Sequence, residues 1–125
     1  MGISIYYAAK RQHHLSNEEK SAIEQIVSDS DVMAELDNYL QTGLGYNWET
    51  FTIYEPDFTS DTIFDGATKL PDNSEDAILT GLEHWLNTLS LIRHIIPDAA
   101  WHVHLDDTDI PWNSATRSFD TGLLS

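Results

Sequence analysis

The pattern with the clearest chemical potential is the run WHVHLD at residues 101–106. Two histidines at alternate positions of a strand project to the same face, and Asp106 follows them with the same spacing. Imidazole nitrogens and carboxylate oxygens are ligands that zinc accepts, so His102, His104 and Asp106 are the candidate ligands of a small metal-dependent enzyme or module. The same alternation is typical of the polar face of any half-buried strand, and we prefer that interpretation. We therefore expect no bound metal.

The rest of the sequence contains no reaction signature. Cysteine is absent, which excludes thiol nucleophiles, cysteine metal sites and disulfides. There is no glycine-rich phosphate loop, no Gly-x-Ser-x-Gly motif and no nucleophile next to a plausible base. Carboxylates are so numerous that chance pairs are expected, so no catalytic pair can be selected from them. The sequence predicts a protein that is not an enzyme and needs no cofactor.

Net charge limits the possible partners most strongly. The 125 residues include 21 Asp and Glu but only 6 Lys and Arg, which gives a formal net charge of -15. A field of this sign repels nucleic acid and anionic membranes and speeds the encounter with basic surfaces. The N-terminal residues lack the basic start and long apolar run of a signal peptide, and no segment approaches a membrane span of about 20 apolar residues. We expect a cytoplasmic protein with a basic protein partner, and neither nucleic acid nor membrane as a ligand.

Hydrophobic periodicity predicts the elements that must position these residues. Alternating apolar residues indicate strands, and apolar residues three and four apart indicate helices. The order is strand, helix, strand, strand, helix, strand, at residues 3–9, 17–42, 49–55, 62–70, 78–96 and 100–106. The tail after them is expected to be irregular. This order predicts one α+β domain over residues 1–125 with the ferredoxin-like βαββαβ topology, a four-stranded antiparallel sheet with both helices on one face.

The helix boundaries are marked by capping residues. Ser16 with Glu19 three residues later forms a capping box, and Gly43 can close the helical region as a C-cap. The polar run at residues 28–31 interrupts the apolar pattern between them. The sequence leaves open whether this region is one kinked helix or two. The last helix has capping side chains and acids at residues 71–76, and Pro97 ends it.

The ferredoxin-like topology would bring acidic segments together. The start of the first strand, the entry to the second and the exits of the third and fourth share one end of such a sheet. An acidic surface with aromatic residues suits the capture of a basic partner. The candidate partner-binding residues are Trp48, Glu49, Asp72, Glu75, Asp76, Asp106, Asp107, Asp109 and Trp112. A purely structural explanation stays open, because acids favour helix N-termini and turns, and both tryptophans would suit a core.

The small size, the strong acidity, the lack of cysteine and the lack of catalytic motifs resemble one class of protein. The chain resembles the immunity proteins that bacteria pair with toxins, including those of contact-dependent inhibition systems. The resemblance is one of type and involves no diagnostic motif. It implies tight, stoichiometric binding that neutralises one basic, nuclease-like toxin. The alternative of a ferredoxin-like ligand-binding homodimer also stays open, so both a monomer and a homodimer fit the sequence.

Overall fold

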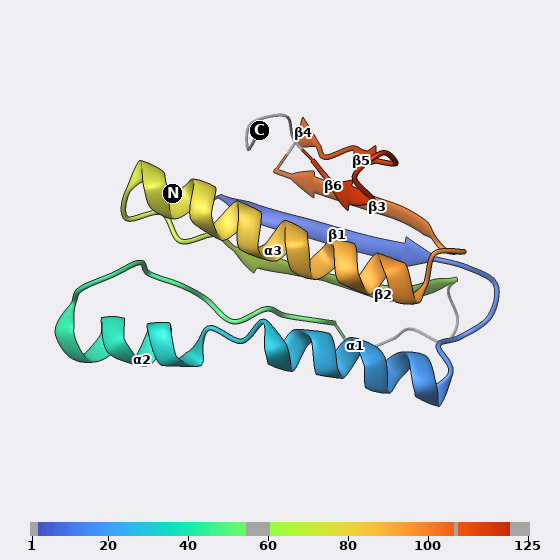
Figure 1. Ribbon diagram of the computed structural model, residues 1–125, viewed down its shortest axis with the longest axis horizontal. Helices are drawn as coiled ribbons and strands as arrows, with labels where there is room; N and C mark the ends of the chain where they lie inside the picture. Colours follow the sequence, from blue (N-terminus) through green and yellow to red (C-terminus); the bar gives the residue numbers. More distant parts are fainter. Residues whose placement is uncertain (1–2, 55–60, 107, 121–125) are drawn as a thin grey trace.

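An antiparallel sheet forms the centre of the protein, with the strand order β2-β1-β3-β4 (Figure 1). The computed structural model describes residues 3–54, 61–106 and 108–120. The strands of this sheet are β1 (Ser4–Lys10), β2 (Thr62–Lys69), β3 (Ala100–Leu105) and β4 (Thr108–Asp109). In the register of β1, Ser4 lies opposite Lys69, and Ile5 lies opposite both Thr68 and Leu105. The predicted α+β class and the four-stranded antiparallel sheet are confirmed.

Each long strand buries one face, as its alternating sequence predicts. In β1, Ile5, Tyr7 and Ala9 are buried, whereas Tyr6 between them is partly exposed. Val103 of β3 is buried as well. The opposite face of the sheet carries exposed polar residues of the same strands, among them Lys10, Lys69 and His102, and we call it the open face.

Three helices accompany the sheet: α1 (Asn17–Asp29), α2 (Met33–Thr42) and α3 (Glu75–Ile95). The predicted capping box is present, because the Glu19 N–H donates to Ser16 Oγ at 3.1 Å and the Ser16 N–H donates to Glu19 Oε1 at 2.8 Å. Residues 17–42 form two helices and not one kinked helix. Gly43 ends α2 in the left-handed conformation, with a φ of 71°.

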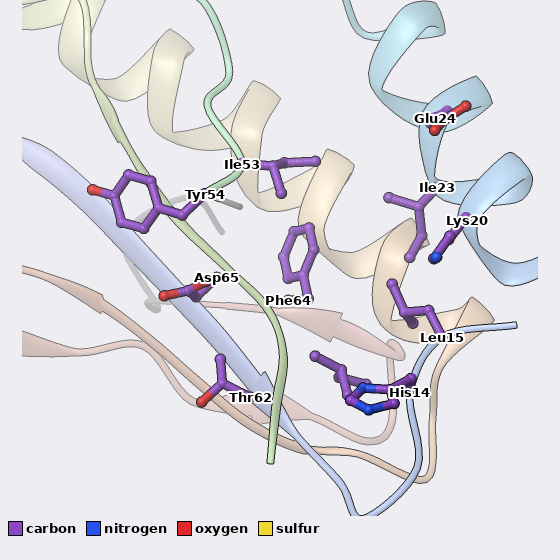
Figure 2. Close-up of a pocket in the computed structure, with 11 residues that line it drawn as sticks. His14, Leu15, Lys20, Ile23, Glu24, Ile53, Tyr54, Thr62, Phe64 and Asp65 are labelled. Carbon is purple, nitrogen blue, oxygen red and sulfur yellow. The ribbon is translucent and has the colours of Figure 1, made fainter. Parts of the chain in front are cut away.

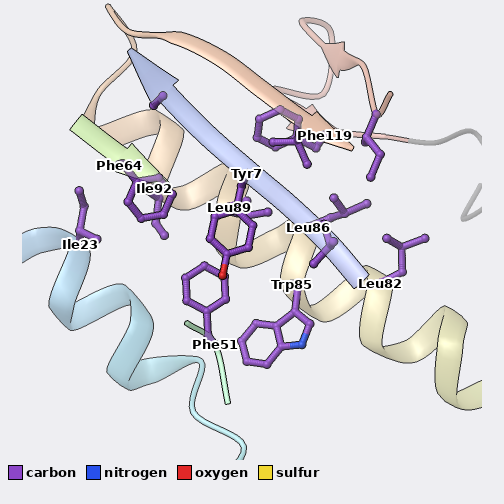
Figure 3. Packing of buried hydrophobic residues seen from close by; sticks show 14 of the residues in the cluster. Tyr7, Ile23, Phe51, Phe64, Leu82, Trp85, Leu86, Leu89, Ile92 and Phe119 are labelled. Atoms are coloured by element: carbon purple, nitrogen blue, oxygen red, sulfur yellow. The ribbon is translucent and has the colours of Figure 1, made fainter. Parts of the chain in front are cut away.

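The core lies between α3 and the buried face of the sheet (Figure 3). One side of α3 supplies Leu82, Trp85, Leu86, Leu89 and Ile92, all of which are buried. From α1, Ile23 joins the same cluster. A fully buried side chain of this size contributes about 1.5–3 kcal/mol, so α3 is the main source of core stability.

The predicted second strand, residues 49–55, is not formed in the described part of that range, which ends at residue 54. Two residues three positions apart, Trp48 and Phe51, are buried, whereas Ile53 and Tyr54 are exposed. This spacing does not fit the alternation of a strand. Phe51 stacks on the ring of Tyr7 at a centroid distance of 4.8 Å, so the segment is held by side chains and not by a strand ladder.

The ferredoxin-like arrangement is therefore not confirmed. The fourth strand of the sheet is the two-residue β4, which pairs with β3, in place of a strand from residues 49–55. The tail, predicted to be irregular, contains a second small sheet formed by β5 (Trp112–Asn113) and β6 (Ser118–Phe119). Phe119 is buried, and its N–H donates to Ser90 Oγ of α3 at 3.0 Å. The tail thus extends the core along α3.

Candidate functional site

Acidic residues from three segments lie at the end of the sheet where β1 begins. The Asp106 N–H donates to the Ser4 carbonyl at 3.3 Å, and Ser4 lies opposite Lys69. The Lys69 ammonium is 3.8 Å from a Glu49 oxygen and 4.0 Å from an Asp72 oxygen. Because α3 begins just after Asp72, its first-turn acids belong to the same end. We call this surface the acidic end, and its residues are Glu49, Asp72, Glu75, Asp76 and Asp106.

Asp72 is fixed by Asn47, a residue that the sequence did not single out. The Asn47 side-chain amide donates to Asp72 Oδ1 at 2.7 Å, and Asn47 Oδ1 accepts the N–H groups of Asp72 at 2.7 Å and of Asn73 at 3.2 Å. The hydrogen bond from Asn47 and then the charge of Lys69 lower the pKa of Asp72. A lone asparagine in a loop carries no signal that would have revealed this role.

Glu75 and Asp76 are exposed in the first turn of α3. The N-cap is Ser74, whose Oγ accepts the Ala77 N–H at 3.0 Å. Carboxylates in this position are stabilised by the helix dipole, typically by about 0.3–1 kcal/mol each. Their placement has a structural cause, and their exposure leaves both carboxylates available to a partner.

The acids after β3 are placed differently from one another. Asp106 is exposed and takes a left-handed backbone conformation, with a φ of 44°, at the turn from β3 to β4. Asp107 lies outside the described residues. Asp109 lies in β4, and its Oδ1 is 2.8 Å from His102 Nε2. Asp109 therefore belongs to the open face of the sheet rather than to the acidic end.

The two predicted tryptophans lie in different places. Trp48 is only 8% exposed and packs edge-on against His84 and Trp85 of α3, and it lines a hollow together with Glu49 and Lys69. Trp112 is half-buried at the opposite end of α3, where it contacts His94 and lies 4.2 Å from the Arg93 guanidinium carbon. Trp48 therefore lies beside one of the acids but exposes little of its ring, whereas Trp112 packs near the last turn of α3 and not beside the acids.

The three candidate metal ligands lie near one another without forming a site. The rings of His102 and His104 stack at a centroid distance of 4.8 Å, and Tyr6 stacks on His104 at 4.9 Å. His104 Nδ1 is 2.6 Å from the carbonyl of Asp106, which can only accept, so this nitrogen carries the proton. Within the described residues, no group of three or more His, Asp or Glu side chains is arranged to hold a metal ion.

A mostly apolar pocket of about 300 Å³ lies between α1 and β2 (Figure 2). Leu15, Ile23, Ile53 and Phe64 contribute apolar atoms to its lining. Ile53, Tyr54 and Thr62 also line this pocket. The segment between them in the sequence, residues 55–60, lies outside the described residues. The polar residues of its lining are His14, Lys20, Glu24, Tyr54, Thr62 and Asp65.

A second acidic region was missed in the choice of candidate residues, although the sequence contains its signal. From Ser21 to Thr68 the chain has no Lys, Arg or His. This stretch includes α2, which carries the exposed acids Glu35 and Asp37. The loop after α2 contacts Asp72 and Asn73, so the acidic surface extends from the acidic end toward this helix.

Comparison with protein families, curated proteins and solved structures found no match to this chain. Among the described helices, none combines the length and apolar character needed to cross a bilayer.

Proposed function

We propose that the protein binds a basic partner protein through the acidic end and neutralises it, as an immunity protein neutralises a bacterial toxin. The observation that carries this proposal is the gathering of exposed acids from separate segments around the start of β1. Long-range attraction to such a surface raises the association rate of an oppositely charged partner. A cationic, nuclease-like active site is the kind of surface that would complement it.

In this proposal the protein acts by binding alone and needs neither a cofactor nor catalysis. It works as a monomer in the cytoplasm. Mutual repulsion of two chains with a charge of -15 each opposes self-association, which favours the monomer over the homodimer. The proposal gives the stacked Tyr6, His104 and His102 rings a structural role, in which His102 binds the Asp109 carboxylate and His104 binds the Asp106 carbonyl.

We also propose that the fold is a variant of the ferredoxin-like topology. β1 lies between β2 and β3, as that topology requires. The Tyr54 N–H donates to the Asp65 carbonyl of β2 at 2.8 Å, so the irregular segment before it runs where the missing strand would pair. Slow amide exchange at Tyr54 would support this arrangement, and exchange at the rate of an unprotected loop would contradict it.

The proposed function can be tested by growth rescue. The protein is co-expressed in bacteria with each of the basic toxin domains encoded in the genome of its source, and growth is compared with and without it. The test variant is E75K/D76K, and the matched control is E18K/E24K. Each pair changes the net charge by four, from -15 to -11. E75K/D76K replaces both acids in the first turn of α3, and E18K/E24K replaces one acid in the first turn of α1 and one further along that helix.

We expect rescue from one basic toxin by the parent protein and the control, and weaker rescue by E75K/D76K. Glu18 and Glu24 lie on α1, whose first turn is at the far end of the sheet (Figure 1). Failure to rescue from any basic toxin, or equal rescue by all three proteins, would contradict the proposal.

A further inference from the structure

The apolar side of α2 is only partly covered. None of its residues is buried, and Leu36 and Tyr39 are half-buried against the rest of the protein. Met33 is 45% exposed and Leu40 is 72% exposed. Residues three and four apart share one side of a helix, so Met33, Leu36 and Leu40 form one apolar stripe of which two members face solvent. Among the described residues, none buries these two side chains.

A further exposed leucine continues this stripe beyond the helix. Leu44 follows the C-cap Gly43 and is 69% exposed. The loop that carries it is fixed to the acidic end, because the Asn73 side-chain amide donates to the Gly45 carbonyl at 2.9 Å and Asn47 binds Asp72. Figure 1 shows the end of α2 and the start of α3 on the same side of the molecule. Leu44 is therefore next to a residue that contacts the acidic end, and Leu40 lies four residues before it in the last turn of α2.

The charges around these leucines identify the kind of occupant. The stretch from Ser21 to Thr68, which contains α2, has no basic residue, and α2 itself carries Glu35 and Asp37. A second copy of this chain would bring the same charges and would be repelled, and so would an anionic membrane. A basic protein surface would be attracted.

We propose that Leu40 and Leu44 anchor the basic partner. On the partner's surface, they would enter an apolar depression that is surrounded by Lys and Arg residues. This inference rests on the proposed function and adds to it the source of affinity. Protein interfaces gain most of their affinity from a few side chains that become fully buried in well-packed pockets, whereas the charges at their rim mainly set the association rate. Trp48 is buried in the core and cannot supply that anchor.

The test uses two synthetic basic peptides of identical Lys and Leu composition. In one, the leucines occupy one face of a helix, and in the other the order is scrambled. Each is titrated into the isotopically labelled full chain at physiological salt, and amide chemical shifts give both the affinity and the location. The variant L40S/L44S is compared with L91S, which replaces an exposed leucine near the other end of α3. Because the replaced leucines are exposed, both variants should unfold at the parent's denaturant midpoint.

We expect the amphipathic peptide to bind the parent and L91S about tenfold more tightly than the scrambled peptide. The largest shifts should fall at residues 38–47 and 72–76, and L40S/L44S should bind the two peptides equally. If the parent binds both peptides equally in a salt-dependent manner, the anchor is wrong and the proposed function stands. If the parent binds neither peptide, both are contradicted.

Discussion

The guanidinium of Arg11 and the carboxylate of Glu19 form a two-pronged ion pair that fastens the start of α1 to the end of β1. Arg11 Nη2 lies 2.5 Å from Glu19 Oε1, and Arg11 Nη1 lies 3.0 Å from Glu19 Oε2. The Arg11 side chain is only 5% exposed and also contacts Asp98 at 2.9 Å and the carbonyls of His13 and His14. One of the few cations of this acidic protein thus serves its fold and is not available to a partner.

Removal of the Glu19 charge should destabilise the protein. Glu19→Gln leaves the buried Arg11 without its main partner and is expected to lower the free energy of unfolding by about 2 kcal/mol, because hydrogen bonds to charged groups contribute about 1.5–3 kcal/mol. Urea unfolding measures this change. Glu18→Gln, at an exposed position in the same turn, should change stability by less than about 0.5 kcal/mol. Equal effects of the two variants would show that the ion pair contributes nothing specific.

The same pair predicts a defined acid sensitivity. The hydrogen bonds from Arg11 and then from the Ser16 backbone lower the pKa of Glu19 from 4.5 to about 2. The stabilisation is fully present above pH 4.5, where Glu19 is ionised in both states, and is lost as the pH falls toward 2. The stability difference between the parent and Glu19→Gln should therefore shrink over this window. Unfolding curves at a series of pH values measure it, and a difference that stays constant down to pH 2 is not compatible with this pKa.

Gly66 should not tolerate a side chain. A Cβ at this position would lie 2.1 Å from the Thr52 carbonyl oxygen and 2.7 Å from Tyr7 Cε2. Gly66→Ala must displace the segment that Tyr7 holds through its hydroxyl, and should cost about 1–3 kcal/mol. Thermal or urea unfolding measures the loss. Ala67→Ser, at the adjacent position on the other face of the sheet, is the control. Parent-like stability of Gly66→Ala would mean that residues 50–54 do not lie over β2.

Asn47 should control the order of the loop between α2 and the acidic end. Its Oδ1 accepts the Asp72 and Asn73 N–H groups, so Asn47→Ala should speed hydrogen exchange of these two amides. Asn87→Ala, at an exposed position of α3, should leave their exchange unchanged. Unchanged exchange in Asn47→Ala would show that the loop is held by other contacts. If exchange does increase, the peptide affinity that depends on Leu44 should fall with it.

Local signals in the sequence were sufficient to predict most of the elements. Alternation identified the strands that became β1, β2 and β3, and the Ser16–Glu19 capping box and Gly43 marked helix ends within one residue. These signals depend on neighbours in the sequence, so they can be recognised without the fold. The gathering of Asp72 and Asp106 followed from the antiparallel pairing of the strands that precede them.

The parts that could not be predicted depend on partners far apart in the chain. Trp48 packs against Trp85, and Phe51 stacks on Tyr7, so residues 48–54 follow these rings and do not alternate as a strand. Trp112 packs on Phe119 and under Arg93. The spacing of residue types along the sequence contains no information about such contacts. For the same reason the sequence favoured Trp48 and Trp112 as partner-binding residues and did not single out Leu40 and Leu44, which are exposed.

Capture of a basic protein by the acidic end should be visible in the association rate with the toxin domain that growth rescue identifies. Stopped-flow measurements at rising salt should show the rate constant falling about tenfold or more between about 0.05 M and about 0.5 M salt. E75K/D76K should associate more slowly than E18K/E24K at low salt, and the two should converge at high salt. An association rate that does not depend on salt, or equal rates for the two variants at low salt, would contradict capture by the acidic end.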